Sequence, residues 1–172
     1  MTGHNGRPDL VGEHPEGDLV QVILFVIFMV LWIADSFFLH YTDFMSEYIS
    51  PFIRIPLSVI ILAVSGYVAF LGHRIVFEEE RESPVVIDQG VFRTLRHPLY
   101  FSVILFYLGL LISTCSMAAA VVWVIIIIFY NYIASYEEKL LIKHFGDEYE
   151  VYKKNVPRWI PRFNKKLKGD NL

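Results

Sequence analysis

One uninterrupted stretch limits what this chain can fold into more than any other feature. The 39 residues at positions 98–136 contain no Asp, Glu, Lys, Arg or His. As a single helix the stretch would be ~60 Å long, about twice the hydrocarbon core of a bilayer. The sequence Ser-Thr-Cys-Ser at 113–116, near its middle, predicts a hairpin of two membrane spans, each of about 17 to 20 residues.

The composition of the whole chain agrees with a membrane protein. Mean hydropathy is +0.45 and 55% of the residues are hydrophobic, more than a globular domain normally carries. The net charge of −3 gives no basic surface for nucleic acid, and a single Cys excludes an internal disulfide. The first apolar segment is too long for a signal peptide and follows an acidic N-terminus. We therefore expect an integral membrane protein.

Two further apolar segments, at 19–39 and 51–72, precede the hairpin. The prediction is an all-α integral membrane protein with four transmembrane helices, or five if one span is split. Residues 1–18 form a polar N-terminal segment, and 19–73 hold the first two spans. The second half, 74–172, divides into a loop at 84–97, the membrane hairpin at 98–136 and a tail at 137–172. Asp35, inside the first span, is expected to be partly hydrated and to face His40, with a proton or substrate role as the alternative.

The positions of the basic residues predict the orientation. Segments 73–97 and 137–172 contain 13 of the 15 Lys and Arg residues, and the connections on the opposite side contain none. By the positive-inside rule, these two segments lie on the cytoplasmic side of the cell membrane. In the tail, the spacing of Leu141, Phe145, Tyr149, Tyr152 and Val156 predicts one apolar helical face. Gly146 is expected to break this helix, with Asp147 capping the second part.

Motifs of several common site types are absent from the sequence. No glycine pattern marks a nucleotide-binding turn, and there is no HExxH zinc motif or GxSxG nucleophile motif. The six His residues are scattered, so we expect no metal site. What remains is a polar cluster at one membrane face. The hairpin brings His97 and Tyr100 close to Glu137 and Glu138, and aromatic rings with carboxylates suit a small organic cation.

The same residues carry a family resemblance. GVFRTLRHPLY, two apolar spans, and then EEKLLIKHFGDEYEVYKKNVPRWIP resemble the isoprenylcysteine carboxyl methyltransferase and phospholipid methyltransferase family of integral membrane enzymes. The resemblance covers about residues 84–163, and the chain looks like a minimal prokaryotic member. It implies that 74–172 is the catalytic half, which binds S-adenosylmethionine from the cytosol and releases S-adenosylhomocysteine.

The resemblance also implies roles for individual residues. The cofactor site would comprise Val86, Ile87, Gln89, Gly90, Val91, Phe92, His97, Leu99, Tyr100, Glu137 and Glu138. Gly90 is expected to let the backbone approach the ligand closely. Arg93, Arg96 and Arg158 are candidates for orienting an anionic substrate head, while its hydrocarbon tail lies in the bilayer. No catalytic base is assigned.

The predicted activity is methyl transfer to a lipid-attached nucleophile, most simply the carboxylate of an isoprenylcysteine-like substrate. One departure bears on the substrate: eukaryotic isoprenylcysteine enzymes place an Arg shortly before the Glu pair, and residues 130–135 here contain no cation. Three alternatives stay open at this point. They are N-methylation of a phospholipid amine, an NADPH-dependent membrane lipid reductase, and a non-enzymatic membrane protein.

Overall fold

A computed structural model describes residues 17–78 and 84–160, and in those ranges every regular element is helical. The α-helices are α1 (Gly17–Ile33), α2 (Met45–Tyr48), α3 (Pro51–His73), α4 (Pro98–Thr114), α5 (Met117–Phe145) and α6 (Asp147–Asn155). Helix α1 continues as the π-helical turn η1 (Ala34–Leu39), α3 continues as η2 (Arg74–Glu78), and η3 (Gly90–Arg93) is a 3₁₀ turn. Of the predicted N-terminal polar segment, only Gly17 and Asp18 are described, and both belong to α1.

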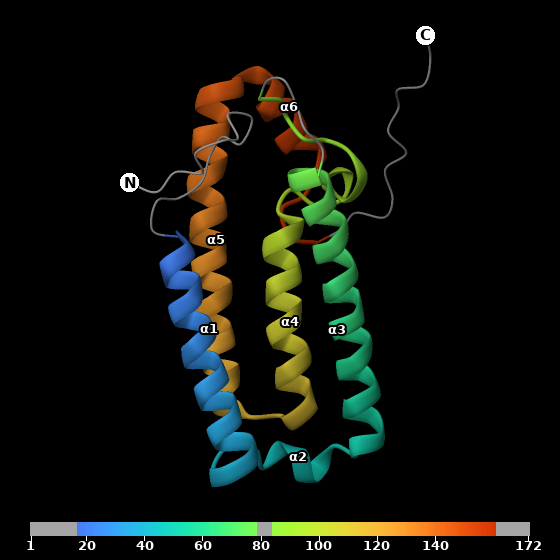
Figure 1. The fold of residues 1–172 in the computed structure, drawn as a ribbon, viewed down its shortest axis with the longest axis vertical. Helices are drawn as coiled ribbons and strands as arrows, with labels where there is room; N and C mark the ends of the chain where they lie inside the picture. The colour runs from blue at the N-terminus through green and yellow to red at the C-terminus, as the bar shows by residue number, and fades with distance from the viewer. Residues whose placement is uncertain (1–16, 79–83, 161–172) are drawn as a thin grey trace.

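Four apolar helices run side by side along the long axis of the molecule (Figure 1). Among the described residues, three helical segments are long and apolar enough to cross a membrane: Gly17–Leu39, Pro51–Phe77 and Met117–Phe145. Helix α4 is apolar but has only 17 residues, which corresponds to ~25 Å, the lower end of the range for a spanning helix. The predicted all-α membrane fold is confirmed, with α4 as its shortest apolar helix.

The predicted hairpin is formed by α4 and α5. Helix α4 ends at Cys115, whose φ of 58° reverses the chain, and the Ser116 side chain caps α5 by accepting a hydrogen bond from the Ala119 amide at 3.2 Å. Helix α5 then runs without a break through Glu137 and Glu138 to Phe145. Its 29 residues extend over ~43 Å, more than a bilayer core, so its last turns can stand outside the hydrocarbon.

Helices α3 and α4 approach closely because small residues line their contact. Ser58 donates a hydrogen bond to the Gly109 carbonyl and Ser65 donates one to the Ser102 carbonyl, both at 2.7 Å. A Cβ added to Gly72 would lie 3.0 Å from the Leu99 side chain. Small residues at such contacts let membrane helices pack backbone against backbone. This contact therefore fixes the position of α4, including its first turn.

The buried core lies between α1, α4 and α5. Its members are Phe28, Ile104, Tyr107, Ala119, Val122, Ile126 and Tyr130. Two tryptophans tie the helices together: the Trp32 indole N–H points to the Leu110 carbonyl at 3.1 Å, and that of Trp123 to the Ile104 carbonyl at 3.0 Å.

The expectation for Asp35 is wrong. Asp35 is buried, and its carboxylate accepts hydrogen bonds from the Thr42 amide at 2.9 Å, the Thr42 hydroxyl at 2.6 Å and the Ser116 hydroxyl. His40 instead contacts Asp43, with 2.7 Å between Nδ1 and Oδ2. Asp35 therefore joins the end of α1 to the hairpin turn, because hydroxyl groups replace the water that a carboxylate otherwise requires.

After α5 the tail forms a second helix, α6, which folds back over the end of the bundle where α4 begins. Gly146, with φ of 57°, separates α5 from α6, so the predicted break is confirmed. The predicted cap is wrong, because Gly146 itself occupies the N-cap position and Asp147 is the first helical residue. Tyr149, Tyr152 and Val156 are buried against Leu141, Ile142, Phe145 and Val86, which confirms the predicted apolar face.

Candidate functional site

The loop that precedes α4 is held in place by backbone contacts. Within it, the Phe92 amide donates to the Gln89 carbonyl at 3.0 Å and the Arg93 Nε donates to the Asp88 carbonyl at 3.1 Å. The C-terminal region fixes it from outside, since the Tyr152 hydroxyl donates to the Phe92 carbonyl at 2.8 Å. These hydrogen bonds hold the loop in place between α3 and α6.

His97 and Tyr100 mark the entry of the chain into α4. Pro98 is the first helical residue, where its missing N–H leaves no helical hydrogen bond unmade. The rings of His97 and Tyr100 are parallel, with centroids 5.7 Å apart and an interplanar angle of 5°. Tyr100 also contacts the Tyr130 ring at 5.1 Å. This stack forms an aromatic surface at the membrane boundary.

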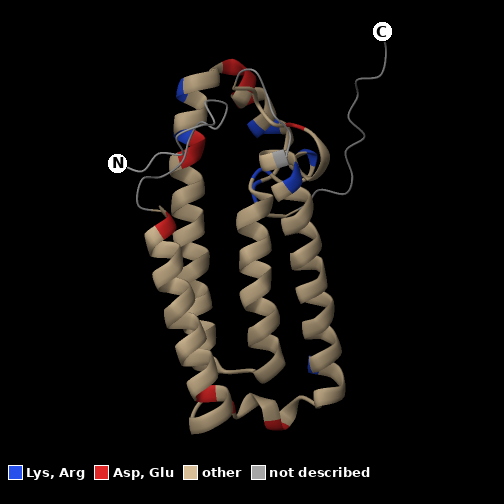
Figure 2. Ribbon diagram, in the orientation of Figure 1, with Lys and Arg blue, Asp and Glu red and all other residues tan. Residues whose placement is uncertain are grey.

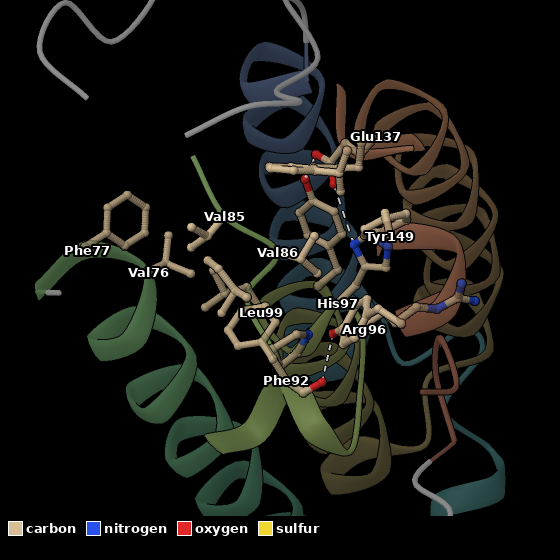
Figure 3. Close-up of a pocket in the computed structure, with 16 residues that line it drawn as sticks. Val76, Phe77, Val85, Val86, Phe92, Arg96, His97, Leu99, Glu137 and Tyr149 are labelled. Atoms are coloured by element: carbon tan, nitrogen blue, oxygen red, sulfur yellow. Dashed lines mark hydrogen bonds and ion pairs between the residues drawn. The ribbon is translucent and has the colours of Figure 1, made fainter. Parts of the chain in front are cut away.

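Glu137 lies above that surface and faces a cavity (Figure 3). Its carboxylate accepts a short hydrogen bond from the Tyr100 hydroxyl, and its Oε2 is 3.6 Å from Nδ1 of His97. The cavity has a volume of about 230 Å³ and is bounded by η2, the loop, the start of α4, the last turns of α5 and α6. Figure 3 shows Val76, Phe77 and Val85 on the opposite side of the cavity from Arg96 and Tyr149.

Glu138, next in sequence, has a different environment. Only 1% of Glu138 is exposed, and Arg158 holds its carboxylate with both sides of the guanidinium, Nε to Oε1 at 2.9 Å and Nη2 to Oε2 at 2.7 Å. Arg96 Nη1 lies 3.3 Å from Oε1 and Lys153 Nζ lies 3.4 Å from Oε2. The His97 Nε2–H donates to Oε1 at 3.2 Å. Glu138 is therefore the centre of an ion cluster that joins α5, the loop and the C-terminal segment.

Burial controls the ionisation of the groups around the cavity. Burial lowers the pKa of His97 below its ordinary value of 6.5, and the nearby Arg158 and Arg96 lower it further against the opposing effect of Glu138. His97 is thus a neutral imidazole at pH 7. Burial also raises the pKa values of Tyr149 and Tyr152, so both keep their hydroxyl protons.

The cavity is lined by seven of the eleven predicted cofactor residues and by nine residues that were not predicted to bind the cofactor, among them the predicted substrate residue Arg96. The seven are Val86, Ile87, Phe92, His97, Leu99, Tyr100 and Glu137. The other nine are Val76, Phe77, Val85, Arg96, Pro98, Leu141, Phe145, Tyr149 and Tyr152. Of these nine, Leu141, Phe145, Tyr149 and Tyr152 carried a sequence signal, the helical spacing of the tail. Val76 and Phe77 carried none, because α3 continues as η2 beyond the predicted end of its span.

The remaining predicted cofactor residues, Gln89, Gly90, Val91 and Glu138, do not line the cavity. Gly90 has φ of +54°, a conformation that favours glycine, and an added Cβ would lie 2.5 Å from Cδ1 of Ile75. The close neighbour that Gly90 accommodates is thus η2.

The three predicted substrate arginines have different environments. Arg93 binds the loop backbone. Arg96 lies beside Glu138 with its side chain largely buried, and its Nε and Nη1 have no hydrogen-bond partner among the described residues. Arg158 extends past Glu138, where its Nη1 donates to Asn131 at 2.8 Å and to Ser135 at 2.9 Å. A cation therefore reaches the 131–135 face of α5 from a distant part of the chain, although that segment has none of its own.

In the described ranges, 17–78 and 84–160, no group of three or more His, Cys, Asp or Glu side chains could hold a metal ion. The polar groups that line the cavity are a carboxylate, phenol rings, an imidazole and the guanidinium of Arg96, which is paired with Glu138. Because Glu138 offsets the charge of Arg96, the Glu137 carboxylate and the rings suit an organic cation of modest size.

Comparison with known proteins adds an independent finding. A family described as phospholipid methyltransferase matches residues 57–148, just over half of the chain. The match includes most of α3, the whole of α4, and the whole of α5 with its Glu pair.

Individual relatives match over a similar length of the chain. The protein-S-isoprenylcysteine O-methyltransferase of Mus musculus is 30% identical over 90 residues, which are 52% of this chain and 32% of the mouse protein. The Schizosaccharomyces pombe protein of the same name is 27% identical over 88 residues, 51% of this chain and 37% of the relative. A probable protein-S-isoprenylcysteine O-methyltransferase of Oryza sativa subsp. japonica is 30% identical over 89 residues, 51% and 45%. The match therefore spans less than half the length of these relatives.

Proposed function

The chain belongs to the phospholipid methyltransferase family, and we propose that it transfers a methyl group from S-adenosylmethionine to a lipid-attached nucleophile at the membrane surface. The single observation that carries the proposal is the position of Glu137. Its carboxylate faces a cavity at the membrane boundary, and a hydrogen bond from the Tyr100 hydroxyl fixes it there. A carboxylate held beside aromatic rings recognises positive charge.

The cavity lining fits S-adenosylmethionine. That cofactor carries an ammonium and a sulfonium, and it supplies an electrophilic methyl group when bound. Glu137 would hold the ammonium, and the rings of Tyr100 and Tyr149 would lie near positive charge. The aliphatic lining, which includes Val86 and Leu99, would exclude water from the reacting atoms.

The acceptor that we propose is a carboxylate on a lipid-modified residue, as in isoprenylcysteine. The similarity to protein-S-isoprenylcysteine O-methyltransferases supports this choice. The carboxylate oxygen forms a bond to the methyl carbon while the carbon–sulfur bond breaks, and its electron pair stays on sulfur. The products are a methyl ester and S-adenosylhomocysteine, and no proton is transferred. The protein then contributes alignment and dryness rather than acid–base chemistry.

A phospholipid amine is the second candidate acceptor, favoured by the description of the family. An amine attacks only when neutral, and N-methylation releases a proton. The rate would therefore rise with pH as the amine deprotonates, whereas a carboxylate acceptor is already ionised at pH 7. The pH profile of methyl transfer separates the two acceptors.

We further propose that the cavity faces the cytoplasm. Lys and Arg gather at the cavity end of the bundle, whereas at the other end the described residues include one, Arg54 (Figure 2). This distribution fits the positive-inside rule.

Equilibrium binding of S-adenosylhomocysteine to the detergent-solubilised protein tests the proposal. We expect saturable binding that Glu137→Gln weakens at least ~10-fold, since a charge-assisted hydrogen bond is lost. Tyr100→Phe should weaken it less. The matched control is Glu150→Gln, an exposed position on α6 outside the cavity. Absence of binding at millimolar concentration, or equal weakening by Glu137→Gln and Glu150→Gln, would refute the proposal.

A further inference from the structure

A second cavity lies at the end of the bundle opposite to Glu137. It has a volume of about 560 Å³. The end of α1 with η1, the connection that contains α2, the start of α3 and the end of α4 surround it, and all of these meet at the lower end in Figure 1. Its polar lining includes Ser36, His40, Asp43, Glu47, Arg54 and Thr114.

Two donors in this cavity lack acceptors among the residues that the structure describes. Ser36 is only 7% exposed, and its buried hydroxyl has no hydrogen-bond partner there. The Nε of Arg54 is also buried without a partner in the described ranges. The neighbouring carboxylate of Asp35 does not serve them, because it accepts from Thr42 and Ser116. A buried N–H or O–H left without an acceptor is unfavourable, so this pair indicates a site for an anionic oxygen.

The same cavity also carries negative charge. Asp43 is mostly buried at 16% side-chain exposure and contacts His40, and Glu47 lies in α2. With two carboxylates against the single guanidinium of Arg54, the lining suits a ligand that brings a cation together with its anion. A simple anion such as phosphate would be repelled by the two acids.

The surroundings of the cavity belong to a membrane interface. Large aromatic side chains project outward around it: Phe38, Tyr41, Phe44, Tyr48 and Phe52 are each more than half exposed. Aromatic rings at this level anchor a protein among lipid headgroups. Phe44 and Phe37 also line the cavity itself, which gives the ligand an apolar neighbour.

We propose that this cavity binds the headgroup of a zwitterionic phospholipid with a primary ammonium. The phosphate would accept hydrogen bonds from Arg54 and Ser36, and the ammonium would donate to Asp43 and Glu47. The site lies at the opposite membrane face from the methyl-transfer cavity, so its lipid is a structural ligand and not the methyl acceptor. It would join the start of α3 to the end of α1, two elements that meet across the cavity.

Native mass spectrometry of the full chain, released from nanodiscs, tests the lipid preference. The probes are phosphatidylethanolamine, phosphatidylcholine and phosphatidylglycerol of identical chains. We expect phosphatidylethanolamine to be retained about tenfold more than either of the others, because phosphatidylcholine has no ammonium N–H and phosphatidylglycerol has no cation. Equal retention of the three lipids would overturn the proposal.

Variants place the lipid in this cavity. Glu47→Gln should remove the preference for phosphatidylethanolamine because it removes an acceptor for the ammonium, whereas Lys143→Gln, an exposed change at the other end of the bundle, should preserve it. Arg54→Gln should lower the retention of all three lipids, since each has a phosphate, and Ser36→Ala tests the same contact if Arg54→Gln fails to fold. A preference that survives Glu47→Gln, or retention that Ser36→Ala leaves unchanged, would contradict the assignment. In all folded variants, S-adenosylhomocysteine binding should be unchanged, which separates this site from the proposed cofactor cavity.

Competition with a soluble headgroup distinguishes a site for a bilayer lipid from a site for a free headgroup. Glycerophosphoethanolamine at millimolar concentration carries the same phosphate and ammonium but no chains. We expect it not to displace phosphatidylethanolamine, because the acyl chains of the lipid add contacts in the bilayer, beside the exposed aromatic side chains that surround the cavity. Full displacement at that concentration would show a site for a soluble molecule and overturn the lipid assignment.

Discussion

Arg158 grips Glu138 with two parallel hydrogen bonds, at 2.9 and 2.7 Å, although the two residues lie on opposite sides of the bend at Gly146. A paired guanidinium and carboxylate of this geometry fixes orientation as well as distance. Because Arg158 also reaches Asn131 and Ser135, the C-terminal segment is fastened along α5 next to the cavity. In the fold, Glu138 holds the wall of the site together, and Glu137 faces its interior.

Neutralising Glu138 should therefore unfold the site. Glu138→Gln leaves Arg158 and Arg96 buried beside an uncharged amide, and breaking one partner of a buried ion pair typically costs about 3–5 kcal/mol. We expect a clearly lower Tm in detergent, together with loss of S-adenosylhomocysteine binding. Glu148→Gln, an exposed change in the first turn of α6, is the matched control and should leave Tm almost unaltered. Equal Tm values for the two variants would contradict the structural role of Glu138.

His97 should make stability depend on pH. Burial keeps its pKa in the folded protein below 6.5, whereas the unfolded chain takes up a proton near that pH. The unfolded state therefore binds more protons below pH 6.5, and stability falls as pH decreases from about 7 toward the lowered pKa, by up to ~1.4 kcal/mol per pH unit. Thermal unfolding between pH 7.5 and 5 measures this effect. His97→Gln should have a flatter profile, and identical slopes would show that His97 titrates normally in the fold.

The hairpin was predictable because a charge-free run of that length admits few alternatives, and a hairpin brings its two polar ends together. The ion cluster was not. Its partners, Glu138 and Arg158, are separated by a glycine bend whose direction no local pattern specifies. Val76 and Phe77 were not predicted to line the cavity for a related reason, since hydropathy does not show that α3 continues as η2 toward it. The separate environments of Glu137 and Glu138 follow from helix geometry, because adjacent residues on α5 point about 100° apart.

Ligand binding should protect α6 from protease. Tyr149 and Tyr152 line the cavity, so a ligand held there favours the closed position of α6, in which Lys153 and Lys154 are helical. At 100 times its Kd, S-adenosylhomocysteine stabilises the bound state by about 2.7 kcal/mol, which predicts roughly 100-fold slower tryptic cleavage if cleavage requires opening of α6. Glu137→Gln is the control, and because it should bind at least ~10-fold more weakly, its protection at that concentration should be about 10-fold or less. Cleavage of the wild type at an unchanged rate would show that α6 does not close over the ligand.

The close approach of α3 and α4 can be tested with two glycines that differ only in their surroundings. A Cβ on Gly109 would lie 2.7 Å from the Leu62 side chain and 3.4 Å from the Ser58 carbonyl, whereas Gly66 has open space around it. Gly109→Ala should separate the helices and destabilise the protein by about 1–3 kcal/mol. Gly66→Ala should be neutral or slightly stabilising, since Ala favours a helix. Because α4 begins with Pro98 and carries Tyr100, Gly109→Ala should also weaken S-adenosylhomocysteine binding from a position well outside the cavity. Equal Tm values for both variants would refute the close contact.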